Sequence, residues 1–295
     1  MPDVSVIIPN FNHANFLKQR IDSVLGQTFG DIEVVLLDNC STDHSREIME
    51  SYRYDRRIRH IEYNTVNNHS PFKQWKRGIE LTGADVIWIA ESDDFADEDF
   101  LSVLLPEIRD NEKLGIAYCQ SWNVNENSQI TGNWKAHTDD LNREKFATNF
   151  TMSGPEYIRN FLVHRNTIPN ASAVLFRRKY YEMAGGVETS FSLCGDWITW
   201  MKILMISDVC YSAMSLNYFR RHENSVIARA VRGFDHSRYV ERYDRTMRKR
   251  FQQYLEERHI DQDHILRTNY NYILQEDTDE QHFESNARGP GAGAV

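Results

Sequence analysis

The sequence is poor in cysteine, which excludes two classes of protein. Its 295 residues hold only four cysteines, and none of them forms a Cys-x-x-Cys pair. Scattered thiols do not make a disulfide framework or a cysteine-rich zinc site, so we expect reduced thiols in a cytoplasmic protein. A chain of this length that is 41% hydrophobic can be stabilised by one large core.

Long hydrophobic runs and an excess of positive charge are also absent. No window approaches the roughly 20 apolar residues that cross a bilayer. The first 17 residues lack the basic start and apolar run of a signal peptide. A net charge of −9 argues against general nucleic-acid binding. We therefore expect a cytoplasmic protein whose contact with the inner face of the plasma membrane is peripheral, if it exists.

Residues 4–110 show a regular alternation of strand and helix patterns. Apolar, β-branched runs predict strands at residues 4–8, 31–39, 58–64 and 84–90. Helical spacing and start signals predict helices at residues 14–27, 41–52, 71–82 and 97–110. Such alternation favours an α/β fold with a mostly parallel sheet and helices on both faces.

The pattern after residue 110 is less regular. We expect polar loops over residues 123–150, an apolar helix at 195–207, and one or two amphipathic helices over 234–276. Further elements are expected as a strand at 115–125, a helix at 153–163, and a strand, turn and helix at 170–186. The expected organisation is a catalytic domain at 1–228, with halves 1–110 and 111–228, a helical extension at 229–280 and a disordered tail at 281–295.

Three carboxylates gather where the strand at residues 84–90 ends. Glu91, Asp93 and Asp94 stand within four positions, in "IAESDD". Like charges this close need a compensating partner. A divalent cation held by carboxylate oxygens is one such partner, and it would neutralise a departing diphosphate. Residues 91 and 93 are expected to point the same way on an extended chain. The alternative is a solvated acidic turn before a helix.

Two other predicted strands also end in polar residues. "PNFN" at 9–12 follows the first strand, and Asp38 with Asn39 ends the second. In parallel sheets flanked by helices, ligands lie beyond the carboxyl ends of the strands. Polar groups at three such ends are hard to explain by packing. The sequence therefore predicts a ligand site at this edge of the sheet.

Four motifs in order give the chain a family resemblance. "VSVIIPNFNHANFL" with "VVLLDNCSTDHS", then "IWIAESDD", "GDW" and "YFRRHENS", resemble the family 2 glycosyltransferases over about residues 3–227. The resemblance implies the A-type glycosyltransferase fold, a Rossmann-like mixed sheet flanked by helices, here with a C-terminal helical appendage. It also implies inverting sugar transfer from a nucleoside diphosphate sugar.

The resemblance assigns roles to residues of the acidic turn and the first two strand ends. It implies donor contacts from Pro9, Asn10, Phe11, Glu91, Ser92 and Asp94. Asp93 would ligate Mn²⁺ or Mg²⁺, with His222 as a second ligand, and Arg221 would bind phosphate. Asp38 would accept the N3–H of the base, which favours UDP or dTDP over a cytosine nucleotide. Packing beneath the loop is the alternative for Phe11, and a structural role is the alternative for His222.

A general base is the remaining requirement of inverting transfer, because the acceptor hydroxyl must lose a proton as it attacks. Asp196 in "CGDW" matches the second acid of the family's Glu-Asp motif. A helix N-cap is the alternative role for Asp196. Trp197 would line the acceptor pocket, since sugars stack on aromatic faces, whereas Trp200 is expected in the core.

The chain departs from the family pattern at several site positions. Glu91 replaces the first Asp of the acidic motif, and Gly195 replaces the Glu of the Glu-Asp motif. Asn39 and Cys40 stand where the family has Asp-Gly, and Trp75 and Lys76 stand where many relatives have an Arg-Asn pair. The departures leave open a catalytically degenerate scaffold or glycan-binding module. A sugar nucleotidyltransferase is a further alternative, although its Gly-rich basic loop is missing from "PNFNHANF".

The expected partners follow from the same resemblance. They are a nucleotide-sugar donor and a glycan or lipid-linked glycan acceptor, in bacterial surface polysaccharide synthesis such as that of O-antigen or capsule. The basic segment 242–251 could contact anionic lipid, form a homodimer, or pack on the catalytic domain. We favour packing.

Overall fold

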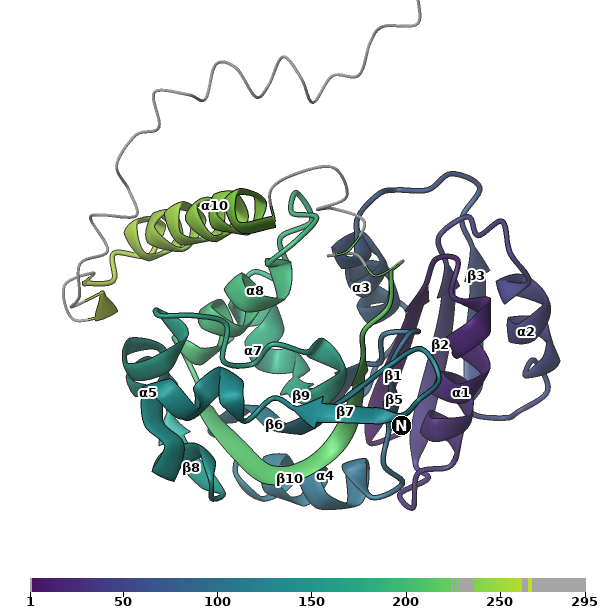
Figure 1. Cartoon of the computed structure of the whole chain (residues 1–295), viewed down its shortest axis with the longest axis horizontal. Coiled ribbons are helices and arrows are strands. Elements are labelled where there is room, and N and C mark those ends of the chain that lie inside the picture. The colour runs from purple at the N-terminus through teal and green to yellow at the C-terminus, as the bar shows by residue number, and fades with distance from the viewer. Residues whose placement is uncertain (1, 224, 226–227, 229–235, 262–264, 267–295) are drawn as a thin grey trace, which may run out of the picture.

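The computed structural model describes residues 2–223, 225, 228, 236–261 and 265–266, and its centre is one mixed β-sheet (Figure 1). In these residues the strands lie in the order β3-β2-β1-β4-β9-β6-β10-β5, with β7 beside β6 and β8 beside β10. The bounds are β1 Val4–Asn10, β2 Ile32–Asp38, β3 Ile58–Tyr63, β4 Val86–Ile89, β5 Phe95–Ala96, β6 Leu114–Val124, β7 Ile130–Asn133, β8 Phe150–Ser153, β9 Val174–Arg177 and β10 Asp208–Arg220.

The parallel part of the sheet is built from the first four long strands. β1 pairs in parallel with β2 on one side and with β4 on the other, and β3 extends the sheet beyond β2. The winding of the chain therefore reverses between β1 and β4. Ligands of such sheets bind at that reversal, beyond the carboxyl ends of the strands. The predicted polar edge lies at this place.

Strand β10 brings a distant segment to the same edge. β10 pairs in parallel with β6, and its residues Asn217 and Tyr218 pair with the short strand β5. β5 directly follows the acidic turn at residues 91–94. The segment "RRH" at 220–222 is therefore placed beside carboxylates that lie about 130 residues earlier in the chain.

Helices cover both faces of the sheet (Figure 1). One face packs against α1 Ala14–Leu25, α2 Ser45–Ser51 and α4 Phe100–Asp110. The other packs against α3 Pro71–Glu80, α6 Gly154–Tyr157, a π-helical turn Ile158–Leu162, α7 Arg178–Met183 and α8 Gly195–Leu204. Along β1, Val6 and Ile8 face the first layer and Ile7 faces the second. Burial on both faces explains the continuous apolar runs of these strands.

The prediction of loops over residues 123–150 is wrong. β7 forms a hairpin with β6, and α5 spans Ala136–Phe146. α5 buries only Thr138 and Phe146, so its sequence carries little apolar periodicity. Tertiary contacts hold it instead, because Phe146 packs edge-on against Phe161 and Tyr211. The other predicted elements are present with shifted ends, whereas the strands β5, β8 and β10 were not expected.

The C-terminal helix α10, His236–Glu257, lies against α8 (Figure 1). Its residues Met247, Phe251, Tyr254 and Leu255 are buried in the same core as α3 and α8. This agrees with the packing favoured for residues 242–251. The remainder of the predicted helical extension lies largely outside the described residues, as does the tail at 281–295. Among the described residues, no helix is both long and apolar enough to cross a bilayer.

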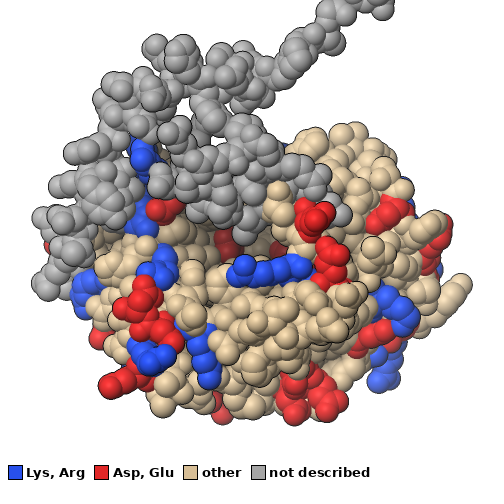
Figure 2. All heavy atoms as spheres, in the orientation of Figure 1, with Lys and Arg blue, Asp and Glu red and all other residues tan. Residues whose placement is uncertain are grey.

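Charges of both signs are interspersed on the face shown in Figure 2. Lys and Arg side chains lie next to Asp and Glu side chains, and no broad basic surface appears there. That distribution agrees with the net charge of −9 and does not resemble a nucleic-acid-binding face.

Candidate active site

The acidic segment after β4 forms a turn, not the extended chain that we expected. The backbone N–H of Asp94 donates to the Glu91 carbonyl at 3.2 Å. The side chains diverge as a result. Glu91 accepts a hydrogen bond from Trp75 Nε1 at 2.7 Å, while Asp93 lies 3.0 Å from His222 Nε2. The expectation that residues 91 and 93 point the same way is therefore wrong.

Asp94 supports this turn from within. It is 2% exposed, and its two oxygens accept hydrogen bonds from the Arg220 N–H at 2.9 Å and from Ser172 Oγ at 2.7 Å. Ser172 also accepts from the N–H of Glu91 at 3.1 Å. With both oxygens engaged, Asp94 is better placed to hold the turn than to contact a sugar.

Two buried arginines compensate part of the acidic charge. Arg20 of α1 donates from Nε to the Glu91 carbonyl at 2.9 Å, and Arg220 of β10 donates from Nε to the Asp93 carbonyl at 2.7 Å. Arg220 is also bound by Gln19 and by the carbonyls of residues 125 and 126. Two guanidinium groups therefore lie against the three carboxyl groups of the turn. Neither arginine was expected in this role.

Burial makes the three carboxyl groups titrate differently. Desolvation raises the pKa of Glu91 to about 8, and the neighbouring charge of Asp93 adds to the rise. Desolvation likewise raises the pKa of Asp94. Burial opposes ionisation of Asp93 too, but nearby His13 and the hydrogen bond from His222 lower the pKa of Asp93. Asp93 is therefore the acid of this turn that is most readily ionised.

His13 joins Asp93 and His222 in a compact cluster. One ligand atom from each of the three residues lies within 4.8 Å of the other two. The two histidines are 8% and 9% exposed, and their rings meet edge to face at 5.3 Å between centroids. Imidazole nitrogens and a carboxylate oxygen are suitable ligands for a divalent transition metal. The donor set therefore fits the metal implied by the family resemblance. His13 was missed from the sequence, although it follows directly on "PNFN".

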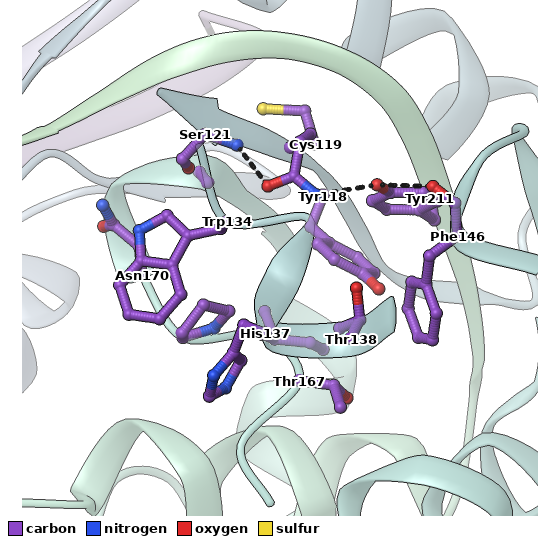
Figure 3. A pocket seen from close by; sticks show the side chains of 14 residues that line it. Tyr118, Cys119, Ser121, Trp134, His137, Thr138, Phe146, Thr167, Asn170 and Tyr211 are labelled. Atoms are coloured by element: carbon purple, nitrogen blue, oxygen red, sulfur yellow. Dashed lines mark hydrogen bonds between the residues drawn. The ribbon is translucent and has the colours of Figure 1, made fainter. Parts of the chain in front are cut away.

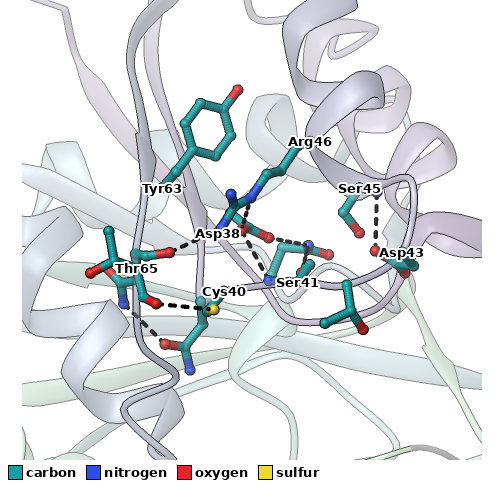
Figure 4. A network of polar contacts seen from close by, with 12 residues as sticks. Asp38, Cys40, Ser41, Asp43, Ser45, Arg46, Tyr63 and Thr65 are labelled. Carbon is teal, nitrogen blue, oxygen red and sulfur yellow. Dashed lines mark hydrogen bonds and ion pairs between the residues drawn. The ribbon is translucent and has the colours of Figure 1, made fainter.

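Asp38 is enclosed at the end of β2 (Figure 4). Its carboxylate accepts hydrogen bonds from Arg46 Nε at 2.8 Å, the Ser41 N–H at 3.1 Å and Asn10 Nδ2 at 3.3 Å. Asp38 has no exposed surface, whereas the Arg46 side chain is 43% exposed and lies over the Tyr63 ring. A base could meet the Asp38 carboxylate only after Arg46 moves aside.

The first loop is tied to the second strand end. Pro9 and Asn10 are buried in β1, and the Asn39 N–H donates to the Asn10 carbonyl at 2.8 Å. Asn12 adopts a left-handed backbone with φ of 57° and bonds to Ser41 and Thr42. Asn10 therefore acts by shaping the loop, and half-buried Phe11 is the member of the predicted set with surface to offer a base.

Asp196 lies in the first turn of α8, one residue inside its start. One oxygen accepts a hydrogen bond from Asn166 Nδ2 at 3.0 Å. Burial raises the pKa of Asp196 to about 6, although its hydrogen bonds act in the opposite direction. The N-cap position belongs to Cys194, with φ of 60°, so Asp196 is not the N-cap. A partly buried carboxylate with a pKa near neutrality is suited to general-base work.

The packing around Gly195 explains why this chain lacks the Glu of the family's motif. A Cβ at this position would lie 2.6 Å from the ring of Phe72 in α3, so the phenyl group fills the space of a side chain. Phe72 packs edge-on against Trp75, which bonds to Glu91. The departures at Trp75, Glu91 and Gly195 are therefore parts of one packed unit that joins α3, α8 and the acidic turn.

Three predicted site residues contact other protein groups: a histidine, the core and a tryptophan ring. Ser92 is 1% exposed and its hydroxyl lies 2.9 Å from His13 Nδ1, so it contacts a histidine instead of open space. Trp197 is 6% exposed and donates from Nε1 to the Leu162 carbonyl at 3.0 Å, which places it in the core. Arg221 is exposed and lies over the ring of Trp134 at 5.4 Å. Trp200 is fully buried, as predicted.

A small cavity lies between Thr167 and Trp134 (Figure 3). Its lining includes Trp134, Asn170 and Tyr118, and its volume is about 20 Å³. Trp134 Nε1 and Asn170 Nδ2 are buried, and no described residue accepts a hydrogen bond from them. A cavity of this size holds about one water molecule, which would satisfy these donors. It is too small for a sugar ring.

Comparisons with known proteins agree with this fold. The sequence profile of Glycosyl transferase family 2 matches residues 5–182. Glycosyltransferase GlyG of Streptococcus pneumoniae is 28% identical over 110 residues, which are 37% of this chain and 36% of GlyG. Hyaluronan synthase of Pasteurella multocida is 28% identical over 149 residues, or 50% of this chain and 15% of that protein. The chain thus spans about a third of GlyG and about a seventh of hyaluronan synthase.

Solved structures with the same fold include S. aureus TarS, residues 1–349. Its complex with UDP superposes with a TM-score of 0.61 at 16% identity, over 95% of this chain and 77% of TarS. Its complex with UDP-GlcNAc gives 0.60 at 14% identity, over 81% and 70%. The A-type glycosyltransferase fold predicted from the sequence is confirmed. The profile match, which spans more than half of the chain, places it in glycosyl transferase family 2.

Proposed function

We propose that this chain transfers a sugar, with inversion at the anomeric carbon, from a UDP- or dTDP-sugar to a hydroxyl group of a glycan acceptor. The observation that carries the proposal is the meeting of Asp93 with two histidines at the reversal of the sheet, where such folds bind ligands. A site with ligands for a divalent cation suits a substrate with a diphosphate.

The donor would bind across the ends of β1, β2 and β4. Phe11 offers a partly exposed aromatic face for the base, and Asp38 offers a carboxylate once Arg46 moves aside. Arg221, exposed at the end of β10, would bind phosphate. Two TarS complexes contain UDP and UDP-GlcNAc, which supports uracil as the base of the donor nucleotide.

A divalent cation would be held by Asp93 and His222, and when bound it supplies positive charge to the departing diphosphate. Glu91, fixed by Trp75, would contact the ribose or the donor sugar. Glu91 is therefore oriented by a residue that itself departs from the family pattern.

Asp196 is the proposed general base. Its pKa of about 6 leaves the carboxylate mostly ionised at neutral pH and still basic enough to take a proton from a hydroxyl group. Asn166 and backbone N–H groups at the start of α8 hydrogen-bond to the carboxylate and would orient it. A single carboxylate suffices, because inversion in one displacement forms no covalent intermediate.

The proposed setting is bacterial surface polysaccharide synthesis. The relatives include hyaluronan and chondroitin synthases of Pasteurella multocida, which are named for polysaccharide products. The acceptor would be a glycan, free or lipid-linked. A peripheral contact with the inner membrane surface would bring the enzyme to a lipid-linked acceptor.

A donor screen tests the proposal. The chain would be incubated with a panel of UDP- and dTDP-sugars, Mn²⁺ and oligosaccharide acceptors, and release of the nucleoside diphosphate would be measured. Proton NMR of the product would give the anomeric configuration. We expect turnover of one donor with inversion. Binding of nucleotide without turnover of any donor would favour the catalytically degenerate alternative, and formation of a nucleotide sugar from a sugar phosphate would favour the nucleotidyltransferase.

A further inference from the structure

The geometry points to His13 as a third protein ligand of the cation, which makes the site a two-histidine, one-carboxylate site that selects Mn²⁺ over Mg²⁺. This inference rests on the proposed function in one respect, namely the identity of the substrate that the cation would bind. It assigns a ligand that lies 80 residues before Asp93 and 209 residues before His222 in the sequence. It also distinguishes Mn²⁺ from Mg²⁺, whereas the family resemblance implies either cation.

His13 is held in position on three sides. Its ring nitrogen Nδ1 lies 2.9 Å from Ser92 Oγ, so Nε2 is the nitrogen that a cation would meet. Its carbonyl accepts the N–H groups of Phe16 and Leu17 at the start of α1, both at 2.9 Å. Asn12, the residue before it, is bonded to the loop that follows β2. A fixed ring with a partner on its other nitrogen is the usual arrangement of a metal-binding histidine.

The separations between ligand atoms suit one ion. His222 Nε2 and Asp93 Oδ2 are 3.0 Å apart. Two atoms bonded at about 2.1 Å to an octahedral ion, at right angles to each other, also lie about 3 Å apart. The ligand atom of His13 is within 4.8 Å of both others, which places it near enough to serve the same ion. His13 and His222 come from opposite ends of the domain, and both are nine-tenths buried here.

The donor atoms decide the choice of metal. Mg²⁺ prefers an all-oxygen environment and gives up its water reluctantly, whereas imidazole nitrogens suit transition metals. A site with two imidazoles and one carboxylate offers Mg²⁺ a single suitable ligand. Mn²⁺ accepts both nitrogen and oxygen donors, and three protein ligands leave positions open for phosphate oxygens.

The test compares His13→Gln with His60→Gln in the full chain. His60 is an exposed histidine on β3, so its substitution is the same chemical change away from the cluster. Circular dichroism and thermal unfolding first establish that both variants fold. Binding of Mn²⁺ and Mg²⁺ is then measured by titration, alone and with UDP. Pulsed EPR of bound Mn²⁺ counts imidazole ligands through their ¹⁴N couplings.

We expect wild type and His60→Gln to bind Mn²⁺ at least about tenfold more tightly than Mg²⁺, with ¹⁴N couplings from two imidazoles. His13→Gln should lose about 10–100-fold in Mn²⁺ affinity, change little for Mg²⁺, and show one imidazole.

A folded His13→Gln with unchanged Mn²⁺ affinity and couplings overturns the assignment of His13 and leaves the transferase proposal standing. Conversely, two imidazoles on Mn²⁺ without any binding of UDP would support the cation site and contradict the donor proposal. If His13→Gln does not fold, the wild-type spectrum decides alone. A spectrum with one imidazole, or no bound Mn²⁺, rejects His13 as a ligand.

Discussion

At the scale of single residues, charge compensation determines how three acids can share one turn. Arg20 and Arg220 reach the carbonyls of Glu91 and Asp93 from segments 71 and 127 residues away. The sequence shows the acids side by side but gives no local signal for these partners, because they depend on how β10 returns to the sheet. Asp93 could be predicted from its motif. The arginines and His13 could not, because they depend on long-range pairing.

Replacing Glu91 by Gln tests how much an ionised carboxylate at position 91 destabilises the folded protein. Burial raises the pKa of Glu91 to about 8. The protonated carboxyl group therefore stabilises the fold fully at pH values below its ordinary pKa of 4.5, and this stabilisation is lost as the pH rises through about 8. Glutamine has no charge and can still accept from Trp75. In EDTA at pH 8.5 we expect E91Q to unfold about 2–4 °C above wild type, and at pH 4.5 at the same temperature. A lower Tm than wild type at pH 8.5 would show that the ionised form is stabilised.

The base role of Asp196 makes a kinetic prediction. Asp196→Asn removes the proton acceptor but keeps the shape, so kcat should fall by about 10²–10⁴-fold while KM for the donor changes little. Because only the ionised carboxylate acts, wild-type kcat should fall as pH decreases through about 6. Asp110→Asn, an exposed residue at the end of α4, is the matched control. Equal losses in both variants, or a kcat that is flat across pH 5–7, would contradict the assignment.

At the scale of secondary-structure elements, α3 connects the acidic turn with the start of α8. Its residue Phe72 fills the space beside Gly195 at the start of α8, and its residue Trp75 holds Glu91. α3 itself was predictable, because Pro71 lies in its first turn and its apolar residues recur at helical spacing. α5 was not, because it buries only two residues and depends on its neighbours.

A methyl group at Gly195 probes this contact. The new Cβ would lie 2.6 Å from the Phe72 ring, so Gly195→Ala should lower the free energy of unfolding by about 1–3 kcal/mol. Gly30→Ala is the control, because nothing lies within 4 Å of its added Cβ, and it should change stability by less than about 0.5 kcal/mol. Urea denaturation measures both. Equal stability of the two variants would show that Phe72 moves aside without cost.

At the scale of the whole molecule, α10 belongs to the same hydrophobic core as α3 and α8. Phe251 and Leu255 are fully buried against the layer that contains α8. Arg248 lies over the Trp197 ring at 5.1 Å and donates to the carbonyls of Val163 and His164, close to the loop that carries Asn166. The amphipathic pattern predicted a helix here. Its partner is a surface formed from distant segments, which no local pattern contains.

Phe251→Ala should therefore destabilise the entire domain. Removal of a fully buried phenyl group costs about 3–5 kcal/mol, and we expect one cooperative transition shifted to lower urea concentration. Lys249→Ala, at an exposed position of the same helix, should leave the midpoint unchanged. Loss of α10 signal in a separate early transition, with the main transition unmoved, would show that the helix is an independent appendage.

Metal-dependent binding of a uracil or thymine nucleotide is the central claim for the molecule, and calorimetry tests it most directly. UDP, dTDP and CDP would be titrated into wild type and Asp93→Asn, each with Mn²⁺ and then with EDTA. We predict that UDP or dTDP binds wild type with Mn²⁺, that CDP binds at least about tenfold more weakly because it lacks the N3 proton, and that EDTA or Asp93→Asn removes binding. No binding of any nucleotide to folded wild type, or equal binding with EDTA, would contradict the claim.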